Sequence, residues 1–424
     1  MTTSAPEQLS RQLTDAGRED SMKILLATFW QVPHVGGVWK YMTQLKQRLE
    51  LMGHQVDLLG TGPDKVHMPG SNKEIAKETL RPLIAAKLSA SRVPQIHVDP
   101  YVMHCEFERY YLELAAAYFG LEHYDIIHTH DIFAARALGR VKSPKTALVA
   151  HVHGSVAVEV TMNYRLNPQL GVAENSPAWN YFNGIEHYGA TSGDVTVTAN
   201  NWQKQLLVNS FGVPEARIRV FPYGLDIDEF ERQASKGTTM QRPPDKKIII
   251  CPARLSFVKG IDILITALGI LKWTRQDWVC WIVGDGEQRA ELEQLTAAFQ
   301  LQQNVLFLGV RDDIPGLLRI SDIFVHSCIQ DNQPFSLMEA QVAGLPALVS
   351  TAGGLPEMVE HDVTGLISPV RDSVKLAEQL GLLLANDSLR EQLGHNAKLW
   401  GTAHWSMDRM VEQVLDVYQS VIKK

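Results

Sequence analysis

The chain has 424 residues, a hydrophobic fraction of 45%, a charged fraction of 21% and a formal net charge of −7. This length exceeds what one ordinary hydrophobic core serves, so two domains are expected. The acidic balance, without a dense run of Lys and Arg, excludes nucleic acid as the main partner.

The N-terminal residues 1–21 are polar and lack the apolar segment of a signal peptide, so a flexible tail is expected there. No apolar run of the sequence reaches the length that spans a bilayer. The four cysteines are scattered without CxxC spacing, which favours buried thiols in a reducing compartment. These features predict a cytoplasmic protein whose sparse basic residues leave membrane association open without requiring it.

The first half alternates apolar strands with amphipathic helices. Residues 23–28 predict a strand, and apolar positions spaced by three and four predict a helix from Val38 to Met52. Residues 61–120 are interpreted as an irregular insertion that contains one good helix at 106–119. Further strands are expected at 56–59, 125–130, 147–153, 195–199 and 218–224. Such βαβ units build parallel sheets.

A polar stretch at 229–246, with Gly237 and the pair Pro243-Pro244, predicts an interdomain linker. A second alternating series follows it. Its strands are expected at 247–252, 279–284, 305–308, 323–326 and 347–350. Each half is therefore predicted to be a doubly wound sheet, with ligands bound where the strands end at their carboxyl side.

Two carboxylates in the second half, Asp331 and Glu339, have seven residues between them. An apolar segment that starts at Glu339 predicts the first turns of a helix, and Gly344-Leu-Pro346 ends it. Backbone N–H groups at a helix start bind phosphate, and a carboxylate accepts hydrogen bonds from sugar hydroxyls. The pattern favours an anionic, hydroxyl-rich ligand.

Two cations, Arg254 and Lys259, lie on a loop between the strand at 247–252 and an apolar helical pattern. Surface cations are common, but the carboxyl end of a strand is where a phosphate group is expected. The pair Gly36-Gly37 follows the first strand, and glycine permits close approach of the backbone to a phosphate. An ordinary turn also accounts for that pair.

Histidines occur in two His-x-His pairs, His128 with His130 and His151 with His153, on two expected strands. Alternate residues of a strand face one side, so each pair has the geometry of a metal clamp, as in some hydrolases. No nearby set of carboxylates completes a coordination sphere in the sequence, so no metal site is predicted.

The segment Asp226-Ile-Asp228 resembles the DxD metal signature of another enzyme fold. It lies at the edge of the expected linker, where Asp commonly caps a helix. Capping is the preferred interpretation.

Taken in order, these motifs resemble those of the retaining glycosyltransferases of family 4, from about Met22 to the C-terminus. The resemblance implies the GT-B architecture, an α/β fold of two facing Rossmann-like domains with a C-terminal helix that crosses back to the first. The implied N-terminal, acceptor-side domain comprises residues 22–228 plus 405–424. The implied nucleotide-sugar donor domain comprises residues 247–404, and residues 229–246 link the two.

The resemblance also implies roles for single residues. Arg254 and Lys259 bind the donor diphosphate in place of a metal ion, and Glu339 holds the ribose hydroxyls. His153 and Asp331 orient the transferred sugar, although the family has Glu where this chain has Asp331. The other implied donor contacts are Gly36, Gly37, Val310, Arg311, Phe335, Ser336 and Leu337. The family usually has Asn at the position of Tyr223.

The implied function is transfer of a hexose from a nucleotide diphosphate sugar, expected to be UDP-linked, with retention and without a metal or other cofactor. The acceptor is expected to be a sugar, a small metabolite or a lipid-linked sugar, selected by residues 61–120 and 155–190. Three alternatives stay open. They are a nucleotide-sugar epimerase of the same fold, a metal-dependent hydrolase that uses the His-x-His pairs, and a non-enzymatic ligand-binding protein.

Overall fold

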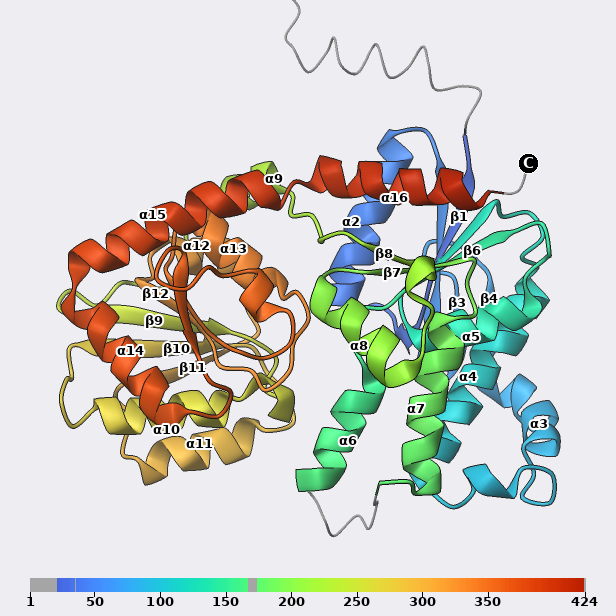
Figure 1. Cartoon of the computed structure of the whole chain (residues 1–424), viewed down its shortest axis with the longest axis horizontal. Helices are drawn as coiled ribbons and strands as arrows, with labels where there is room; N and C mark the ends of the chain where they lie inside the picture. Colours follow the sequence, from blue (N-terminus) through green and yellow to red (C-terminus); the bar gives the residue numbers. More distant parts are fainter. Residues whose placement is uncertain (1–20, 35, 167–173, 423–424) are drawn as a thin grey trace, which may run out of the picture. The chain divides into compact units, whose positions relative to one another are not determined.

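The structure is a computed structural model that describes residues 21–34, 36–166 and 174–422. It divides into two compact units, and each is described by itself. Unit 1 comprises Met1–Phe221 and Val411–Lys424, and unit 2 comprises Pro222–Met410. Each unit has one sheet with helices packed on its faces (Figure 1). Of the tail expected at 1–21, all but Ser21 lies outside the described residues.

Unit 1 contains an eight-stranded sheet of order β4-β3-β2-β1-β5-β6-β7-β8. Strand β1 lies inside the sheet and pairs in parallel with β2 and β5. The strands are β1 (Lys23–Gln31), β2 (Gln55–Thr61), β3 (Lys65–His67), β4 (Glu74–Ala76), β5 (Ile126–Thr129), β6 (Ala147–His151), β7 (Val195–Thr198) and β8 (Ile218–Val220).

Two features of this sheet differ from the expectation. The insertion at 61–120 contains β3 and β4, which extend the sheet in antiparallel pairing. Three-residue strands are too short to show an alternating pattern, so the sequence gives no sign of them. Strands β5 and β6 also end earlier than expected, so that His130 and His153 lie just beyond the last strand residues.

Several helices of unit 1 begin with a capping side chain, which is Asp99, Asp131, Ser176 or Asn200. The Asp99 side chain accepts the N–H groups of Tyr101 and Val102, and Pro100 occupies the first helical position of α4. The helices are α2 (Gly37–Leu51), α3 (Lys77–Lys87), α4 (Pro100–Phe119), α5 (Ile132–Val141), α6 (Val156–Leu166), α7 (Pro177–Ala190), α8 (Asn201–Phe211) and α16 (Met407–Val421). Helix α16 starts in unit 2, but from Val411 onward it belongs to unit 1, as the expected return of the last helix requires.

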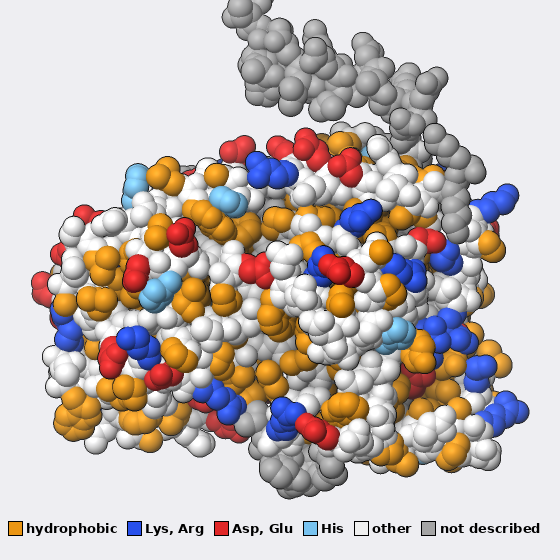
Figure 2. All heavy atoms as spheres, in the orientation of Figure 1, with side chains coloured by type: hydrophobic (Ala, Val, Ile, Leu, Met, Phe, Trp, Pro, Cys, Tyr) orange, Lys and Arg blue, Asp and Glu red, His pale blue; other side chains and the backbone are white. Residues whose placement is uncertain are grey.

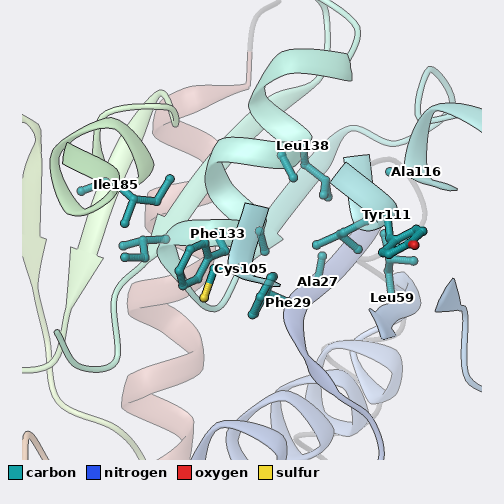
Figure 3. Close-up of a cluster of buried hydrophobic side chains, with 14 of the residues drawn as sticks. Ala27, Phe29, Leu59, Cys105, Tyr111, Ala116, Phe133, Leu138 and Ile185 are labelled. Atoms are coloured by element: carbon teal, nitrogen blue, oxygen red, sulfur yellow. The ribbon is translucent and has the colours of Figure 1, made fainter. Parts of the chain in front are cut away.

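The core of unit 1 lies between the sheet and the helices α4, α5 and α7. Phe29 of β1 stacks on Phe133 of α5 with ring centroids 4.5 Å apart (Figure 3). Tyr111 of α4 and Leu59 of β2 belong to the same buried cluster. This apolar layer fixes the strands whose carboxyl ends carry the residues of interest.

Unit 2 contains a six-stranded sheet of order β11-β10-β9-β12-β13-β14, in which every pair is parallel. The strand order reverses between β9 and β12, and ligands of open α/β sheets bind at such a switch point. The strands are β9 (Lys247–Pro252), β10 (Trp278–Val283), β11 (Val305–Gly309), β12 (Ile323–His326), β13 (Ala347–Ser350) and β14 (Gly365–Ser368).

Helices of unit 2 fall into two groups, because α10 packs with α11 and α14 whereas α13 packs with α12 and α15. They are α9 (Ile227–Ser235), α10 (Ile261–Leu271), α11 (Arg289–Ala298), α12 (Ile314–Arg319), α13 (Phe335–Ala343), α14 (Ser373–Ala385) and α15 (Asp387–His404). The residues expected as a linker, 229–246, belong to unit 2, and part of them forms α9. Asp226 caps α9 by accepting the N–H of Glu229, which confirms the capping interpretation.

One expectation about α13 is wrong. The helix begins at Phe335 rather than at Glu339, so Glu339 lies in its second turn. Pro334 stands at the N-cap, and its carbonyl accepts the N–H of Leu337. Gln333 and Ser336 are polar and interrupt the apolar pattern, so apolar periodicity does not predict this earlier start of the helix.

Charged side chains of both signs are interspersed on the face shown in Figure 2, in keeping with the modest net charge. Among the helices that the structure describes, none combines the length and the apolar character needed to cross a bilayer. The four cysteines are all buried and free.

Candidate active site

The loops that follow β9 and β12 flank the switch point of unit 2 and are joined by backbone contacts. The carbonyl of Val258 accepts the N–H of Ile329 at 2.8 Å, and the Ser327 hydroxyl donates to the carbonyl of Gly260. Gly260 has φ +59°, and a Cβ there would lie 2.3 Å from the Ser327 carbonyl oxygen. Glycine is therefore required for this close approach, which brings Lys259 to the end of β12.

Lys259 and Asp331 form an ion pair across these two loops. The Lys259 Nζ lies 2.6 Å from Asp331 Oδ2, and the two side chains are 20% and 15% exposed. Burial would raise the pKa of the Asp331 carboxyl, but the Lys259 ammonium and a hydrogen bond from His326 outweigh it and hold that pKa well below its usual range. The sequence-predicted cation and acid are thus brought together, with Asp331 ionised.

Arg254 lies on the same loop, two residues after the end of β9, and its side chain is exposed. Within residues 21–34, 36–166 and 174–422, its guanidinium has no hydrogen bond or ion pair to a protein group. A guanidinium presents five N–H donors that suit phosphate oxygens. Arg254 is therefore available to an anionic ligand at the edge of the switch point.

Helix α13 contributes the second predicted carboxylate. Glu339 is only 8% exposed, and Phe335, Ser336 and Leu337 form the first turn of the helix. The partial positive charge of a helix N-terminus favours an anion at this turn. Helix α13 thus contributes two separate groups to the site, the N–H groups of its first turn and the Glu339 carboxylate of its second turn.

Tyr223, which departs from the family pattern, packs beside this helix. Its ring stacks on Phe335 with centroids 5.7 Å apart, and its backbone N–H donates to Gln333 Oε1 at 3.1 Å. Both contacts support the start of α13, which gives Tyr223 a structural role.

The glycine loop after β13 closes on the Asp331 segment. The N–H of Gly354 donates to the Asp331 carbonyl at 3.1 Å. Gly353 has φ +55°, and a Cβ there would lie 1.8 Å from the same carbonyl oxygen. No other residue fits this position without moving the Asp331 backbone.

Val310 and Arg311 line a surface groove of about 510 Å³ between the loop after β11 and residues 236–239. The Arg311 side chain is already engaged, because it donates to the Asp313 carboxylate at 2.8 Å and to Thr239 Oγ1 at 3.0 Å. Val310 is 62% exposed. If this loop meets the donor, its backbone and Val310 are better placed for contact than the Arg311 guanidinium.

In unit 1, the two His-x-His pairs form one cluster, in which His128, His130 and His151 are buried and His153 is partly buried. His128 Nε2 lies 3.3 Å from His151 Nδ1, and His130 Nδ1 lies 3.0 Å from His153 Nε2. His128 Nδ1 is hydrogen-bonded to the Tyr418 hydroxyl at 2.7 Å. Helix α16 thus reaches the histidines of the first sheet.

The chemistry of this cluster favours neutral rings. Burial lowers the pKa of His128 and of His153 to about 3. His128, His130 and His151 do offer nitrogens within 4.8 Å of one another. These three residues are buried, so an ion bound to them would have to lose its hydration, which is costly.

Sequence reasoning missed two groups around the cluster. The Tyr41 ring of α2 lies 5.0 Å from the His151 ring and 5.1 Å from the His153 ring. Asp131 accepts the Phe29 N–H at 2.7 Å and caps α5 through Ala134. The sequence shows Tyr41 only as one position of the apolar stripe of α2. For Asp131, the one available signal was an Asp directly before a helical segment, which is a common capping position.

Helix α7 fixes the loop that carries His153. Glu186 Oε1 accepts the Ser155 hydroxyl at 2.8 Å and the Ala157 N–H at 3.0 Å. Burial raises the pKa of Glu186 to about 7, in spite of these two hydrogen bonds.

The predicted Gly36 and Gly37 lie at the start of α2, with Gly36 as its N-cap in extended conformation.

Two family models match the chain. The model described as Glycosyltransferase Family 4 matches residues 35–229, and the model described as Glycosyl transferases group 1 matches residues 238–400. Between them they cover every strand of the two sheets except β1.

Similar proteins and solved structures agree with these matches. An uncharacterised glycosyltransferase of Methanocaldococcus jannaschii is 25% identical over 94% of this chain and 98% of its own length. Sucrose-phosphate synthase of Thermosynechococcus elongatus superposes with a TM-score of 0.70 at 19% identity, covering 94% of this chain and 99% of that one.

Anabaena HepE in complex with UDP-glucose superposes with a TM-score of 0.67 at 20% identity, over 94% of this chain and all of that one. The fold is thus the two-domain GT-B architecture. Its two Rossmann-like sheets, its returning C-terminal helix and the paired family models lead to one conclusion: the chain belongs to glycosyltransferase family 4, the retaining enzymes that transfer a sugar from a nucleotide-sugar donor.

Proposed function

We propose that this glycosyltransferase moves a hexose from a UDP-linked sugar to an acceptor hydroxyl, with Arg254 and Lys259 on the donor diphosphate in place of a metal ion. The observation that carries the proposal is the position of these cations after β9, at the strand-order reversal of a wholly parallel sheet. Arg254 is exposed there, and Lys259 is held by Asp331.

In the proposed reaction, the bond between the anomeric carbon and the diphosphate oxygen breaks, and the diphosphate leaves with the electron pair. The acceptor oxygen bonds to the same face of that carbon, and its proton passes to the departing diphosphate. Negative charge on the diphosphate is larger in the transition state than in the bound donor. Fixed cations therefore lower the barrier more than they strengthen donor binding.

The remaining roles are proposed residue by residue. Glu339 accepts hydrogen bonds from the ribose hydroxyls, while the first turn of α13 faces the sugar and phosphate with its backbone N–H groups. Asp331 orients the transferred sugar, and His153 of unit 1 contacts it. We further propose the domain boundaries 22–228 with 405–424, and 247–404, with residues 229–246 as linker.

Relatives supply the proposed substrate classes. An Escherichia coli relative, 24% identical over 71% of this chain, is named UDP-Gal:alpha-D-GlcNAc-diphosphoundecaprenol alpha-1,3-galactosyltransferase. A Mycobacterium tuberculosis relative, 26% identical over 53% of this chain, is named a GDP-mannose-dependent phosphatidylinositol monomannoside mannosyltransferase. We propose an acceptor of the same broad kind, a sugar or a lipid-linked sugar, reached from the cytoplasm.

The test has two stages. UDP- and GDP-linked hexoses are first screened by thermal shift, since a bound donor raises stability by mass action. The best donor is then incubated with candidate acceptors, and release of nucleoside diphosphate is followed with and without EDTA. Metal-independent release, with an α-linked product from an α-linked donor by NMR, supports the proposal.

Other outcomes favour the alternatives. Conversion of the donor into an isomer without release of nucleoside diphosphate favours the epimerase. Hydrolysis that EDTA abolishes and a divalent ion restores favours the metal-dependent hydrolase. Donor binding without any turnover across the acceptor panel contradicts the enzymatic proposal.

A further inference from the structure

His326, the last residue of β12, contacts the ion pair of the donor loops from inside the sheet. Its Nε2 lies 2.7 Å from Asp331 Oδ2, the same oxygen that lies 2.6 Å from Lys259 Nζ. The imidazole is 2% exposed. Asp331 is ionised and can only accept, so His326 Nε2 must carry the hydrogen and donate it.

The opposite nitrogen of the ring is left without a partner. His326 Nδ1 is buried, and no described residue forms a hydrogen bond with it. An unpaired buried acceptor is unfavourable, so packing alone would not select a histidine at this position. The hydrogen bond from His326 Nε2 to Asp331 is therefore the contact that favours an imidazole at this position.

The Asp331 carboxylate is held on both of its oxygens. Oδ2 receives Lys259 and His326, and Oδ1 accepts the backbone N–H of Asn332 at 3.0 Å. The Asp331 carbonyl is fixed separately by Gly354. When Lys259 turns toward a diphosphate, His326 and Asn332 are the contacts that would keep the carboxylate where it is.

We propose that His326 is a positioning residue of the donor site, which acts through Asp331. The inference rests on the proposed function and adds a residue to it. When Lys259 leaves Asp331 and binds the donor diphosphate, His326 keeps the Asp331 carboxylate in place. The transferred sugar then meets a carboxylate that is already oriented to accept its hydrogen bonds.

The test compares three substitutions in a double-mutant cycle. His326→Phe keeps an aromatic ring but removes the N–H that donates a hydrogen bond to Asp331. His326→Gln keeps an N–H group that can donate this hydrogen bond. Asp331→Asn removes the negative charge on which His326 acts. We expect His326→Phe to lower kcat about ten- to a hundredfold, as for a hydrogen bond to a charged group. His326→Gln should retain more of the activity, and KM for the donor should change less than kcat.

The cycle separates positioning from packing. In the Asp331→Asn background, His326→Phe should cost less than about threefold further, because the carboxylate is already gone. An equal loss in both backgrounds would show that His326 acts by packing β12, and the inference would fail. His395→Gln, an exposed change on α15, serves as the control, and thermal melting checks that each variant is folded.

Failure of this inference differs from failure of the proposed function. Full kcat of a folded His326→Phe variant beside an active native protein overturns the role of His326 alone. Absence of any donor turnover by the native protein overturns the proposed function, and the inference with it. If His326→Phe does not fold, His326→Leu, which also removes the N–H, is compared in the two Asp331 backgrounds and decides in the same way.

Discussion

The ammonium of Lys259 lies 2.6 Å from the carboxylate of Asp331, although the two residues are 72 positions apart in the chain. The contact joins the loop after β9 to the loop after β12, the two strands between which the order of the sheet reverses. A cation and an acid with different proposed roles toward the donor therefore neutralise each other. The proposed function requires that Lys259 exchange this ion pair for contacts to the donor diphosphate.

Replacement of Lys259 by Ala should mainly lower kcat. Removing one preorganised charge partner of a transition state costs about 3–4 kcal/mol, or two to three orders of magnitude in rate. Arg254→Ala should be similarly harmful, and the double variant should lose less than the sum, because both cations serve one charge. Steady-state kinetics with an authentic donor and acceptor measure the effect.

The control for this prediction is Lys375→Ala, which removes an exposed cation of α14 far along the chain. Because Lys259→Ala also leaves Asp331 without its ammonium, the thermal stability of each variant must be measured beside its kinetics. Near-full kcat of a folded Lys259→Ala protein would mean that the leaving diphosphate is stabilised elsewhere.

Replacement of Glu339 by Gln should weaken donor use while preserving the fold. Glu339 is largely buried in the second turn of α13, where Gln has nearly the same shape. Loss of a charged hydrogen bond to the ribose costs about 1.5–3 kcal/mol, or roughly ten- to a hundredfold in kcat/KM. Glu378→Gln on α14 is the matched control. Unchanged turnover at limiting donor would refute the role of Glu339.

Activity should persist in saturating EDTA. Lys259 and Arg254 supply positive charge at the proposed diphosphate site, so a metal ion is not needed there to stabilise the leaving group. The check is the rate of nucleoside diphosphate release before and after chelation, followed by addition of Mg²⁺, Mn²⁺ or Zn²⁺. A rate that EDTA removes and one of these ions restores would contradict metal-independence.

Much of the architecture follows from the sequence, because long buried strands such as β9 and β10 carry unbroken apolar runs. The placement of Lys259 and Asp331 after strands of one parallel sheet also follows from the sequence, but their ion pair does not. Short elements leave weaker traces. Strands β3 and β4 have three residues each, and the start of α13 alternates polar and apolar residues.

His326 shows a different limit. A histidine at the end of an apolar strand gives no sign of its partner, because the ring meets Asp331 only after the chain turns back through residues 327–330. Tyr41 is similar, since an aromatic residue in an amphipathic stripe predicts core packing whether or not histidines surround it. Contacts that depend on loop conformation cannot be obtained from periodicity.

Unfolding at several pH values should report on Glu186. Its pKa is about 7 in the folded protein, above the ordinary value of 4.5, because burial disfavours the charged form, with a smaller contribution from Glu159. The folded protein therefore retains a proton that the unfolded chain releases between these two values. The stability that Glu186 contributes is complete below about pH 4.5, and it is lost as the pH rises through about 7.

Replacement of Glu186 by Gln should remove this dependence. A Gln oxygen can still accept the Ser155 hydroxyl and the Ala157 N–H, and its amide stays neutral at every pH. The variant should lie within about 1 kcal/mol of the native protein near pH 5 and exceed its free energy of unfolding by up to about 3 kcal/mol above pH 8. Urea unfolding of both proteins from about pH 5 to about pH 8.5 measures the difference, with Glu78→Gln as an exposed control on α3. Parallel profiles across this range would mean that Glu186 stays ionised in the folded protein, and that the Ser155 loop is held by a charged cap.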